Sequence, residues 1–372
     1  MSLDGNSAKI LAVAVAIFFL TTSLSGTFLP IYFNESLQMS VSEIVVILLF
    51  TFLSVGLIPM LTVRRTKRFE RIISLGIILT MIFYVALIFV KSPVILGLAY
   101  GVSLATFWPS FNLLMFRLTE IKERALVVSL LSVAIPGVAG VVSPAVGGFV
   151  IQTFGFVYLF AASIILFLAS FLISLKIRYK AEEQEFGLPK ESGFKLFLVT
   201  FALSGLSESY WLAYPFFLLK VSSTIVSMGL VVTASSLIIT LGTVAVNKLS
   251  DIKRSRVEFA VAGAILHSLW YIGLVFATNI ASVIALSLLS GLASAFSLSW
   301  FVYYGDCFRR QFHASILVMM ELGLMVGRIM NLIPTYVFIG SGNYSSYFAV
   351  LSAASLSLAP LCLLCANRIR KT

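Results

Sequence analysis

The chain has few charged residues and few metal-binding side chains. Only 11% of its 372 residues are Asp, Glu, Lys or Arg, whereas a typical soluble domain has about a quarter. Three cysteines are too few for a disulfide framework, and two histidines exclude a histidine-rich metal site. The sequence contains no Gly-rich phosphate loop, zinc-ligand spacing or nucleophile elbow. We therefore expect no cofactor, no metal, no ATP-driven step and no enzymatic activity.

Apolar residues dominate the chain instead. They make up 60% of it, 32 residues are phenylalanine, and the mean hydropathy is +1.05. A membrane-spanning helix needs about 20 predominantly apolar residues. We therefore predict an all-α polytopic membrane protein whose solvent is a lipid bilayer. Its twelve expected spans are residues 10–33, 42–62, 70–90, 93–116, 125–151, 156–175, 194–219, 223–246, 257–277, 280–305, 313–338 and 345–366.

The basic residues predict how the chain is oriented. Its net charge is +11, and Lys and Arg gather in alternate loops, as in "RRTKR" at 64–68, and near both ends. The opposite loops hold only Lys91 and Lys220. This one-sided bias is the positive-inside pattern, so it accounts for the positive charge without a nucleic-acid partner. We expect a monomer in the cell membrane with both termini in the cytoplasm.

A polar linker and an internal repeat predict two domains. The longest polar stretch, residues 176–193, has six expected spans on either side. "GVSLATFWPSF" (101–111) aligns with "GLASAFSLSWF" (291–301) at an offset near 190 residues. Parallel repeats of this kind are typical of two-bundle transporters. We expect an N-terminal six-helix bundle at 1–175, a cytoplasmic linker at 176–193 and a C-terminal six-helix bundle at 194–372.

Four stretches carry a resemblance to a known family. They are "PMLTVRRTKR" (59–68), "LTEIKERALVVSLL" (118–131), "AGVVSPAVGGFVIQTFGFVYLF" (139–160) and "KLSDIKRSR" (248–256). Over essentially its whole length the chain resembles the major facilitator superfamily. The resemblance implies alternating access, in which two bundles rock around a central cavity lined by the first and fourth spans of each half.

The resemblance also implies gating residues in the basic turns. Arg64 and Arg68 match the first-half turn, which has Val63 where the family has an aspartate, and Asp251 and Arg256 match the second-half turn. An aspartate at a helix end can accept hydrogen bonds from backbone N–H groups of a neighbouring helix and form an ion pair with arginine. These contacts would hold the two helix ends together as a latch. The alternative is that the arginines anchor to lipid phosphates and set the topology. Near the second turn, we expect Asp306 to neutralise Arg309 or Arg310.

A glycine–proline motif implies a further gating element. Pro144, Gly147 and Gly148 match the family pattern, while Ala139 and Ser143 stand where glycines are usual. Small residues let two helices approach closely in lipid, where apolar burial gives little driving force. In the family this motif is typical of exporters and antiporters. The alternative is ordinary packing of small residues.

Three ionisable residues lie inside expected spans. A charge at a span's centre costs roughly 2.5–3.5 kcal/mol, so Glu208, Glu321 and Arg328 need partners or water. Glu321 and Arg328 share one helix face but lie about 10 Å apart along the axis, which argues against a tight bridge. Glu208 and Arg328 lie at similar depth, so we predict a pair between them. We expect all three to couple transport to protons in a wet cavity. The alternative is a structural bridge inside the second bundle.

Polar and aromatic side chains gather in the spans that the resemblance assigns to the cavity. Aromatic residues with one polar atom suit amphipathic solutes. For the tyrosines near span ends, the alternative is a belt at the lipid interface. The predicted substrate-binding residues are Trp108, Asn112, Glu208, Trp211, Tyr214, Trp300, Tyr303 and Tyr304.

These patterns predict a secondary active transporter of a small organic solute, with proton-coupled efflux as the first expectation. Proton–drug exporters of the family often carry an acid in span one and an arginine early in span four. Here span one has no acid, and Gly97 stands about where that arginine would be. An uptake permease or a uniporter for a metabolite is therefore the alternative, and a non-transporting receptor or scaffold is a third.

Overall fold

The computed structural model describes residues 5–65, 69–118, 135–178, 187, 189, 193–253 and 255–369. Every regular element in these ranges is helical. The first half contains α1 (Gly5–Ser25), η1 (Gly26–Phe28), α2 (Leu29–Ile31), η2 (Tyr32–Ser36), α3 (Val41–Arg65), α4 (Phe69–Phe89), α5 (Pro93–Leu118), α7 (Ile135–Gly140), α8 (Ser143–Phe154) and α9 (Phe156–Ser174). The second half contains α10 (Phe194–Glu208), α11 (Ala213–Ser222), α12 (Ile225–Lys253), α13 (Arg256–Phe276), α14 (Ile280–Cys307), η4 (Arg310–Phe312), α15 (His313–Pro334), η5 (Thr335–Ile339) and α16 (Tyr344–Ile369).

The lengths of these helices fit a bilayer. Among the described residues, eleven helical stretches are long and apolar enough to cross a membrane, and each corresponds to one of the predicted spans. The remaining prediction, 125–151, lies partly outside the described residues, and its described part forms α7 and α8. A chain in hydrocarbon must satisfy its backbone hydrogen bonds internally, which selects helices. The predicted all-helical, polytopic architecture is confirmed.

Polar caps mark where some spans begin. Before α3, the backbone N–H and the hydroxyl of Ser40 both donate to the Glu43 carboxylate at 2.8 Å. Before α14, the side-chain oxygen of Asn279 accepts from the backbone N–H of Ser282 at 2.9 Å. In return, the backbone N–H of Asn279 donates to the hydroxyl oxygen of Ser282. Such caps satisfy N–H groups that have no partner within the helix. They fix the transition from loop to span at these two points.

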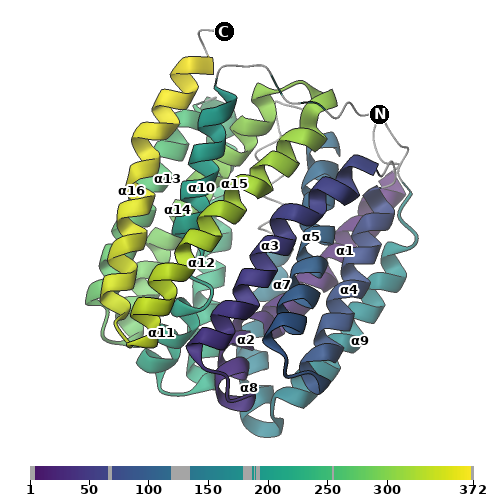
Figure 1. Cartoon of the computed structure of the whole chain (residues 1–372), viewed down its shortest axis with the longest axis vertical. Coiled ribbons are helices and arrows are strands. Elements are labelled where there is room, and N and C mark those ends of the chain that lie inside the picture. Colours follow the sequence, from purple (N-terminus) through teal and green to yellow (C-terminus); the bar gives the residue numbers. More distant parts are fainter. Residues whose placement is uncertain are drawn as a thin grey trace.

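The helices form two groups that lie side by side, one from each half of the sequence (Figure 1). In the first group α5 packs on α3 and α4, and α9 packs on α1 and α4. In the second group α13 packs on α14 and α16, and α10 packs on α15. The start of α1 and the end of α16 lie at the same end of the molecule (Figure 1). This grouping is what a division near 176–193 predicts, and the exact domain bounds stay a prediction.

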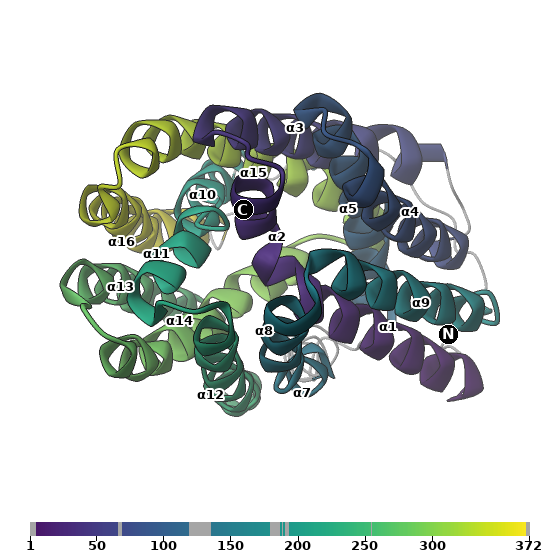
Figure 2. The same cartoon turned by 90° about the horizontal axis from the view of Figure 1, so that it is seen from below.

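The two groups touch mainly through two pairs of helices. α3 contacts α15, and α8 contacts α12, and seen from below these pairs lie on either side of the centre (Figure 2). The glycine–proline motif lies at the second pair. A Cβ atom on Gly148 would lie 2.8 Å from the carbonyl oxygen of Ile225 at the start of α12, and one on Gly147 would overlap the carbonyl oxygen of Leu24 in α1. Glycine is therefore required at both positions for this close approach.

Two spans that the sequence analysis drew as continuous are interrupted. In the first span, α1 ends at Ser25 and a 3-10 turn precedes the short helix α2. In the seventh span, α10 ends at Glu208 and α11 begins only at Ala213. Non-helical backbone at membrane depth is tolerated where it is buried in protein or lines a cavity. Both interruptions therefore point to the centre of the molecule.

Candidate functional site: a central cavity with unequal walls

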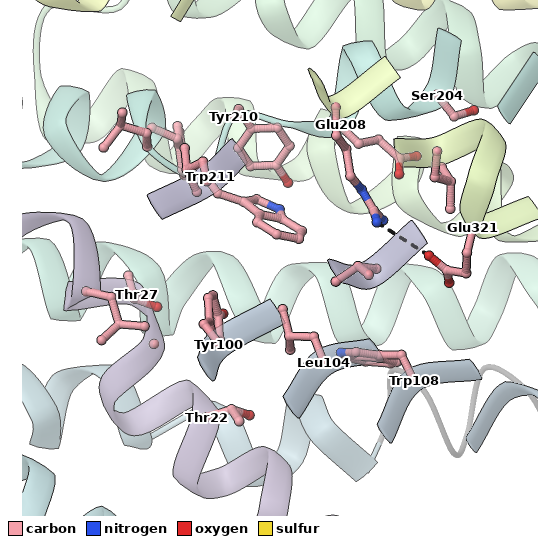
Figure 3. Close-up of a pocket in the computed structure, with 18 of the residues that line it drawn as sticks. Thr22, Thr27, Tyr100, Leu104, Trp108, Ser204, Glu208, Tyr210, Trp211 and Glu321 are labelled. Atoms are coloured by element: carbon pink, nitrogen blue, oxygen red, sulfur yellow. Dashed lines mark hydrogen bonds and ion pairs between the residues drawn. The ribbon is translucent and has the colours of Figure 1, made fainter. Parts of the chain in front are cut away.

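A cavity of about 720 Å³ lies between the two groups of helices. Its two walls differ in chemistry. The first group contributes neutral polar and aromatic side chains, including Thr22, Tyr100 and Trp108. The second contributes acidic side chains, including Glu208 and Glu321, which face the others across the cavity (Figure 3). Among the described residues that line the cavity, every charged side chain belongs to the second group.

Most of the predicted substrate-binding residues line this cavity. The structure brings together Trp108, Asn112, Glu208, Trp211, Tyr214 and Trp300. Tyr303 and Tyr304 are not among the lining residues; Tyr304 is buried, which argues against a place in a lipid-exposed belt, and Tyr303 is half-buried. That the lining residues bind substrate stays a prediction.

Tyr304 and Tyr303 have structural partners instead. The Tyr304 side chain is fully buried, and its hydroxyl donates to the carbonyl oxygen of Ile316 at 2.7 Å. The Tyr303 ring stacks on Trp300 with 5.5 Å between ring centroids, and the indole N–H of Trp300 donates to Thr200 at 3.0 Å. The position of these tyrosines in the packed interior of the second group explains why they do not reach the cavity. For Tyr304, the prediction of a cavity position is wrong.

Arg328 pairs with Glu321, not with Glu208 as predicted. Its guanidinium Nη1 lies 3.4 Å from the Glu321 carboxylate, and both side chains are largely buried, with 16% and 6% exposed. The predicted axial separation between the two backbone positions was correct, but the long arginine side chain extends back along α15 and spans two turns. Within the described residues, no hydrogen bond or ion pair joins Glu208 to Arg328.

The arginine has a second partner in the interrupted segment of the seventh span. The Arg328 guanidinium lies over the Trp211 ring, 5.6 Å from its centroid, which is a cation–π arrangement. The Trp211 ring in turn contacts Phe52 of α3, with centroids 5.7 Å apart. Trp211 therefore links the charged pair of α15 to the other group of helices.

Of the two carboxylates that line the cavity, Glu208 is the more exposed. Its side chain is exposed although it lies at the middle of a span, whereas Glu321 is buried. Figure 3 shows Glu208 beside Tyr210 on the wall formed by the second group. With Glu321 and Arg328 neutralising each other, an ionised Glu208 gives the cavity one uncompensated negative charge. This geometry can bind a proton or a cation.

The sequence analysis missed the side chains that support the interruption after Glu208. The side-chain amide of Asn331 in α15 donates to the carbonyl oxygen of Leu206 at 2.8 Å. The hydroxyl of Tyr347 in α16 lies within hydrogen-bond distance of two acceptors, the carbonyl oxygen of Ser209 at 3.0 Å and the side-chain oxygen of Asn331 at 2.9 Å, and its single hydrogen is shared between them. A carbonyl freed by a helix end and buried without a partner is costly. These contacts remove that cost and hold Glu208 at the cavity.

A third donor completes this set, because the hydroxyl of Tyr271 in α13 donates to the carbonyl oxygen of Ser207. A signal for the set was present in the sequence. An asparagine in an apolar span needs a partner as an ionisable residue does, and Asn331 lies only three residues after Arg328. Within this span only the ionisable residues were considered, so Asn331 was overlooked.

We expect Asn331→Leu to lower the free energy of unfolding by about 1–3 kcal/mol, because it leaves the buried Leu206 carbonyl without its donor. Thermal unfolding of the detergent-purified chain measures this. The matched control is Asn112→Leu, since Asn112 lines the cavity and makes no hydrogen bond among the described residues. An equal loss of stability in both variants would show that Asn331 has no special structural role.

At the end where α16 terminates, Arg256 forms an ion pair with Asp306. It joins the first residue of α13 to the last turn of α14, and both side chains are mostly buried. Asp306 was expected to neutralise Arg309 or Arg310; the described contact is with Arg256, and the expected pairing stays a prediction. The side chains of Arg64 and Asp251, and all of Arg68, lie outside the described part of the chain. Their gating role stays a prediction.

Comparisons with known proteins place this architecture in a family. The sequence model of the Major Facilitator Superfamily matches residues 11–195. The structure is similar to that of the E. coli fucose:proton symporter FucP, with a TM-score of 0.72, 12% identity and coverage of 98% of this chain and 99% of that one. It is also similar to the human organic anion transporter MFSD10, with a TM-score of 0.68, 11% identity and coverage of 95% and 98%.

One sequence relative is the uncharacterized protein YqgE of Bacillus subtilis (strain 168). It is 24% identical over 194 residues, which cover 48% of this chain and 43% of YqgE, so the match spans less than half of either protein. At these identities the solved structures show the fold. Together with the family match and the membrane-spanning helices, they place the chain in the major facilitator superfamily as a multi-pass membrane protein.

Proposed function

We propose that this chain moves a small organic solute by alternating access and that it couples export of the solute to protons. The observation that carries the proposal is Glu208, an exposed carboxylate at the interruption of the seventh span. It faces a cavity whose opposite wall belongs to the other group of helices. Ionisable residues at this depth are functional by default, because an idle charge there is costly.

The position of the cavity supports alternating access. Each wall belongs to one group of helices, so tilting one group against the other opens the cavity first to one side of the membrane and then to the other. Closing the cavity around an ionised Glu208 would remove that charge from water, which costs several kcal/mol. A proton or a positively charged solute on Glu208 removes this cost. Closure is therefore tied to what Glu208 carries.

The contact between α8 and α12 supports a gating role for Pro144, Gly147 and Gly148. These residues lie where the two groups meet, and the backbone N–H of Ala145 donates to Thr233 of α12 at 3.2 Å. An interface this close works as a fulcrum only if the backbones stay in contact. We place Arg64, Arg68, Asp251 and Arg256 at the cytoplasmic end, where they would close the opposite gate.

We expect Gly229→Ala to disturb this fulcrum. A Cβ atom on Gly229 in α12 would overlap the carbonyl oxygen of Pro144, whereas one on Gly242 in the same helix would have its nearest neighbour at 3.8 Å. Overpacking costs about 1–3 kcal/mol, so Gly229→Ala lowers both thermal stability and the transport rate. Gly242→Ala is the control and leaves both near the parent values. Identical behaviour of the two variants would contradict a close contact here.

An uncoupled uniporter, or an uptake permease, is the second candidate. The observation that favours it is the neutral wall of the first group, which among its described lining residues contributes no charge. A coupled antiporter with charges in both halves would have charged side chains on the first wall of the cavity as well. The structural neighbour FucP is named a symporter, so the fold alone does not choose the direction.

Reconstitution into liposomes tests the proposed function. Candidate solutes come from a thermal-shift screen of the detergent-purified chain, and their flux is measured with and without an imposed pH gradient. Proton-coupled export predicts flux against the solute gradient, driven by protons moving the opposite way. Flux that only follows the solute gradient and ignores pH would support the uniporter. Binding without any flux would support a receptor.

A further inference from the structure

We propose that the solute is an organic cation and that Glu208 is its charge partner. The inference rests on the proposed transport function and gives it a substrate class. It follows from a contact that the sequence did not predict, since Arg328 forms its ion pair with Glu321 and acts on Glu208 only through a longer-range electrostatic interaction. The cavity therefore holds one carboxylate that is exposed to the space where a solute would lie.

The charges that line the cavity decide against an anion. Its cationic side chain, Arg328, is already in contact with the Glu321 carboxylate and covered on one face by Trp211. An anion would have to displace Glu321, which would leave a buried carboxylate without its partner. It would also be repelled by Glu208. The structural neighbour MFSD10 is an organic anion transporter, whereas the charges in this cavity argue for a solute of the opposite sign.

The charges also decide against a solute that carries no charge. Such a solute would displace water from Glu208 without replacing it by a positive charge, so the carboxylate would pay its desolvation cost on every binding event. An ammonium or phosphonium group beside Glu208 offsets that cost. A protonated amine can add charge-assisted hydrogen bonds, which are about twice as strong as neutral ones, whereas a phosphonium acts through Coulomb attraction alone.

Aromatic side chains around Glu208 provide the remaining contacts. Tyr210 and Trp211 stand two and three residues after Glu208 in the interrupted segment and line the cavity, and Trp211 is 40% exposed. Trp108 stands on the opposite wall (Figure 3). Aromatic rings attract cations through their electron-rich faces and bury the apolar parts of a solute. One carboxylate between aromatic rings is the combination that recognises substituted ammonium ions.

A pair of matched ions tests the sign of the charge. Tetraphenylphosphonium and tetraphenylborate have nearly the same size and shape and opposite charges. Binding of each to the detergent-purified full chain is measured by titration calorimetry at one pH. We expect the parent to bind the phosphonium and to bind the borate at least about tenfold more weakly. Equal binding of the two ions, tighter binding of the borate, or no binding of the phosphonium would overturn the proposal.

Three variants test the role of Glu208. Glu208→Gln is expected to weaken phosphonium binding about 10- to 100-fold, the loss expected when the Coulomb attraction between unit charges roughly 6 Å apart is removed at an effective dielectric constant of about 20. Glu208→Asp keeps the charge and should retain part of the affinity. Glu35→Gln makes the same chemical change at an exposed residue of η2, outside the cavity, and should leave binding unchanged. Unchanged affinity in Glu208→Gln would overturn the proposal.

These measurements fail separately from those on transport. If the chain binds the phosphonium through Glu208 and no solute moves across liposomes, the transport proposal fails and the cation site stands. If a pH gradient drives flux of a neutral or anionic solute, the transport proposal stands and the cation site is wrong.

Discussion

Proton-driven transport is expected to fall at least about tenfold in Glu208→Gln, while the protein stays folded. Glutamine keeps the size of the side chain but cannot release or bind a proton at neutral pH, so the cavity can no longer exchange a proton between the two sides. Flux is measured in liposomes with a solute identified by thermal shift, under an imposed pH gradient, with a pH-sensitive dye inside the vesicles. Movement of solute down its own gradient persists in the variant at solute concentrations high enough to offset the weaker binding, because the cavity remains.

Glu321→Gln should reduce the gradient-driven flux by a different route. It leaves Arg328 without its carboxylate, and the freed guanidinium then neutralises Glu208 and competes with its proton. Glu35→Gln is again the control for a change at an exposed carboxylate. If both cavity variants transport like the parent and their flux does not respond to pH, proton coupling through this site is wrong.

Arg328→Met is expected to destabilise the protein by about 3–5 kcal/mol, the cost of removing one partner from a buried ion pair. Glu321 then has a buried carboxylate without a cation, and Trp211 loses the guanidinium over its ring. Methionine keeps most of the apolar length of the side chain, so little of the loss comes from packing. Thermal unfolding of the purified chain measures the change.

A double-mutant cycle shows whether the loss comes from the pair. Glu321→Gln combined with Arg328→Met removes both charges, so it should be more stable than Arg328→Met alone. Losses that simply add would mean that the two side chains do not interact, and the 3.4 Å contact would then have no energetic weight.

The spans were predictable from the sequence because lipid imposes a simple rule. A stretch of about 20 apolar residues has few alternatives to a helix there, and the eleven described candidates follow the predicted ranges. The position of Trp108 and Trp211 at one cavity was also predictable, because the resemblance to the family indicates which spans line the cavity.

Contacts between side chains were not predictable in the same way. The sequence fixes the axial distance between Glu321 and Arg328, but it does not say that the arginine folds back along its helix to meet the glutamate. Nor does a count of residues show that Tyr304 turns toward Ile316 and away from the cavity. Rotamers and helix rotation decide these contacts, and they depend on neighbours that are distant in the chain.

The carbonyl groups freed after α10 are held by donors on α13, α15 and α16, and all three helices belong to the same half as α10. A rigid tilt of that half leaves every one of these bonds intact. Glu208 would then move with the second half as part of one rigid body. Its distance from Arg328 stays constant through the cycle, while its distance from Trp108 lengthens and shortens. The distance between two spectroscopic labels on opposite sides of the cavity would therefore change during the cycle. The distance between two labels within the second half would not change.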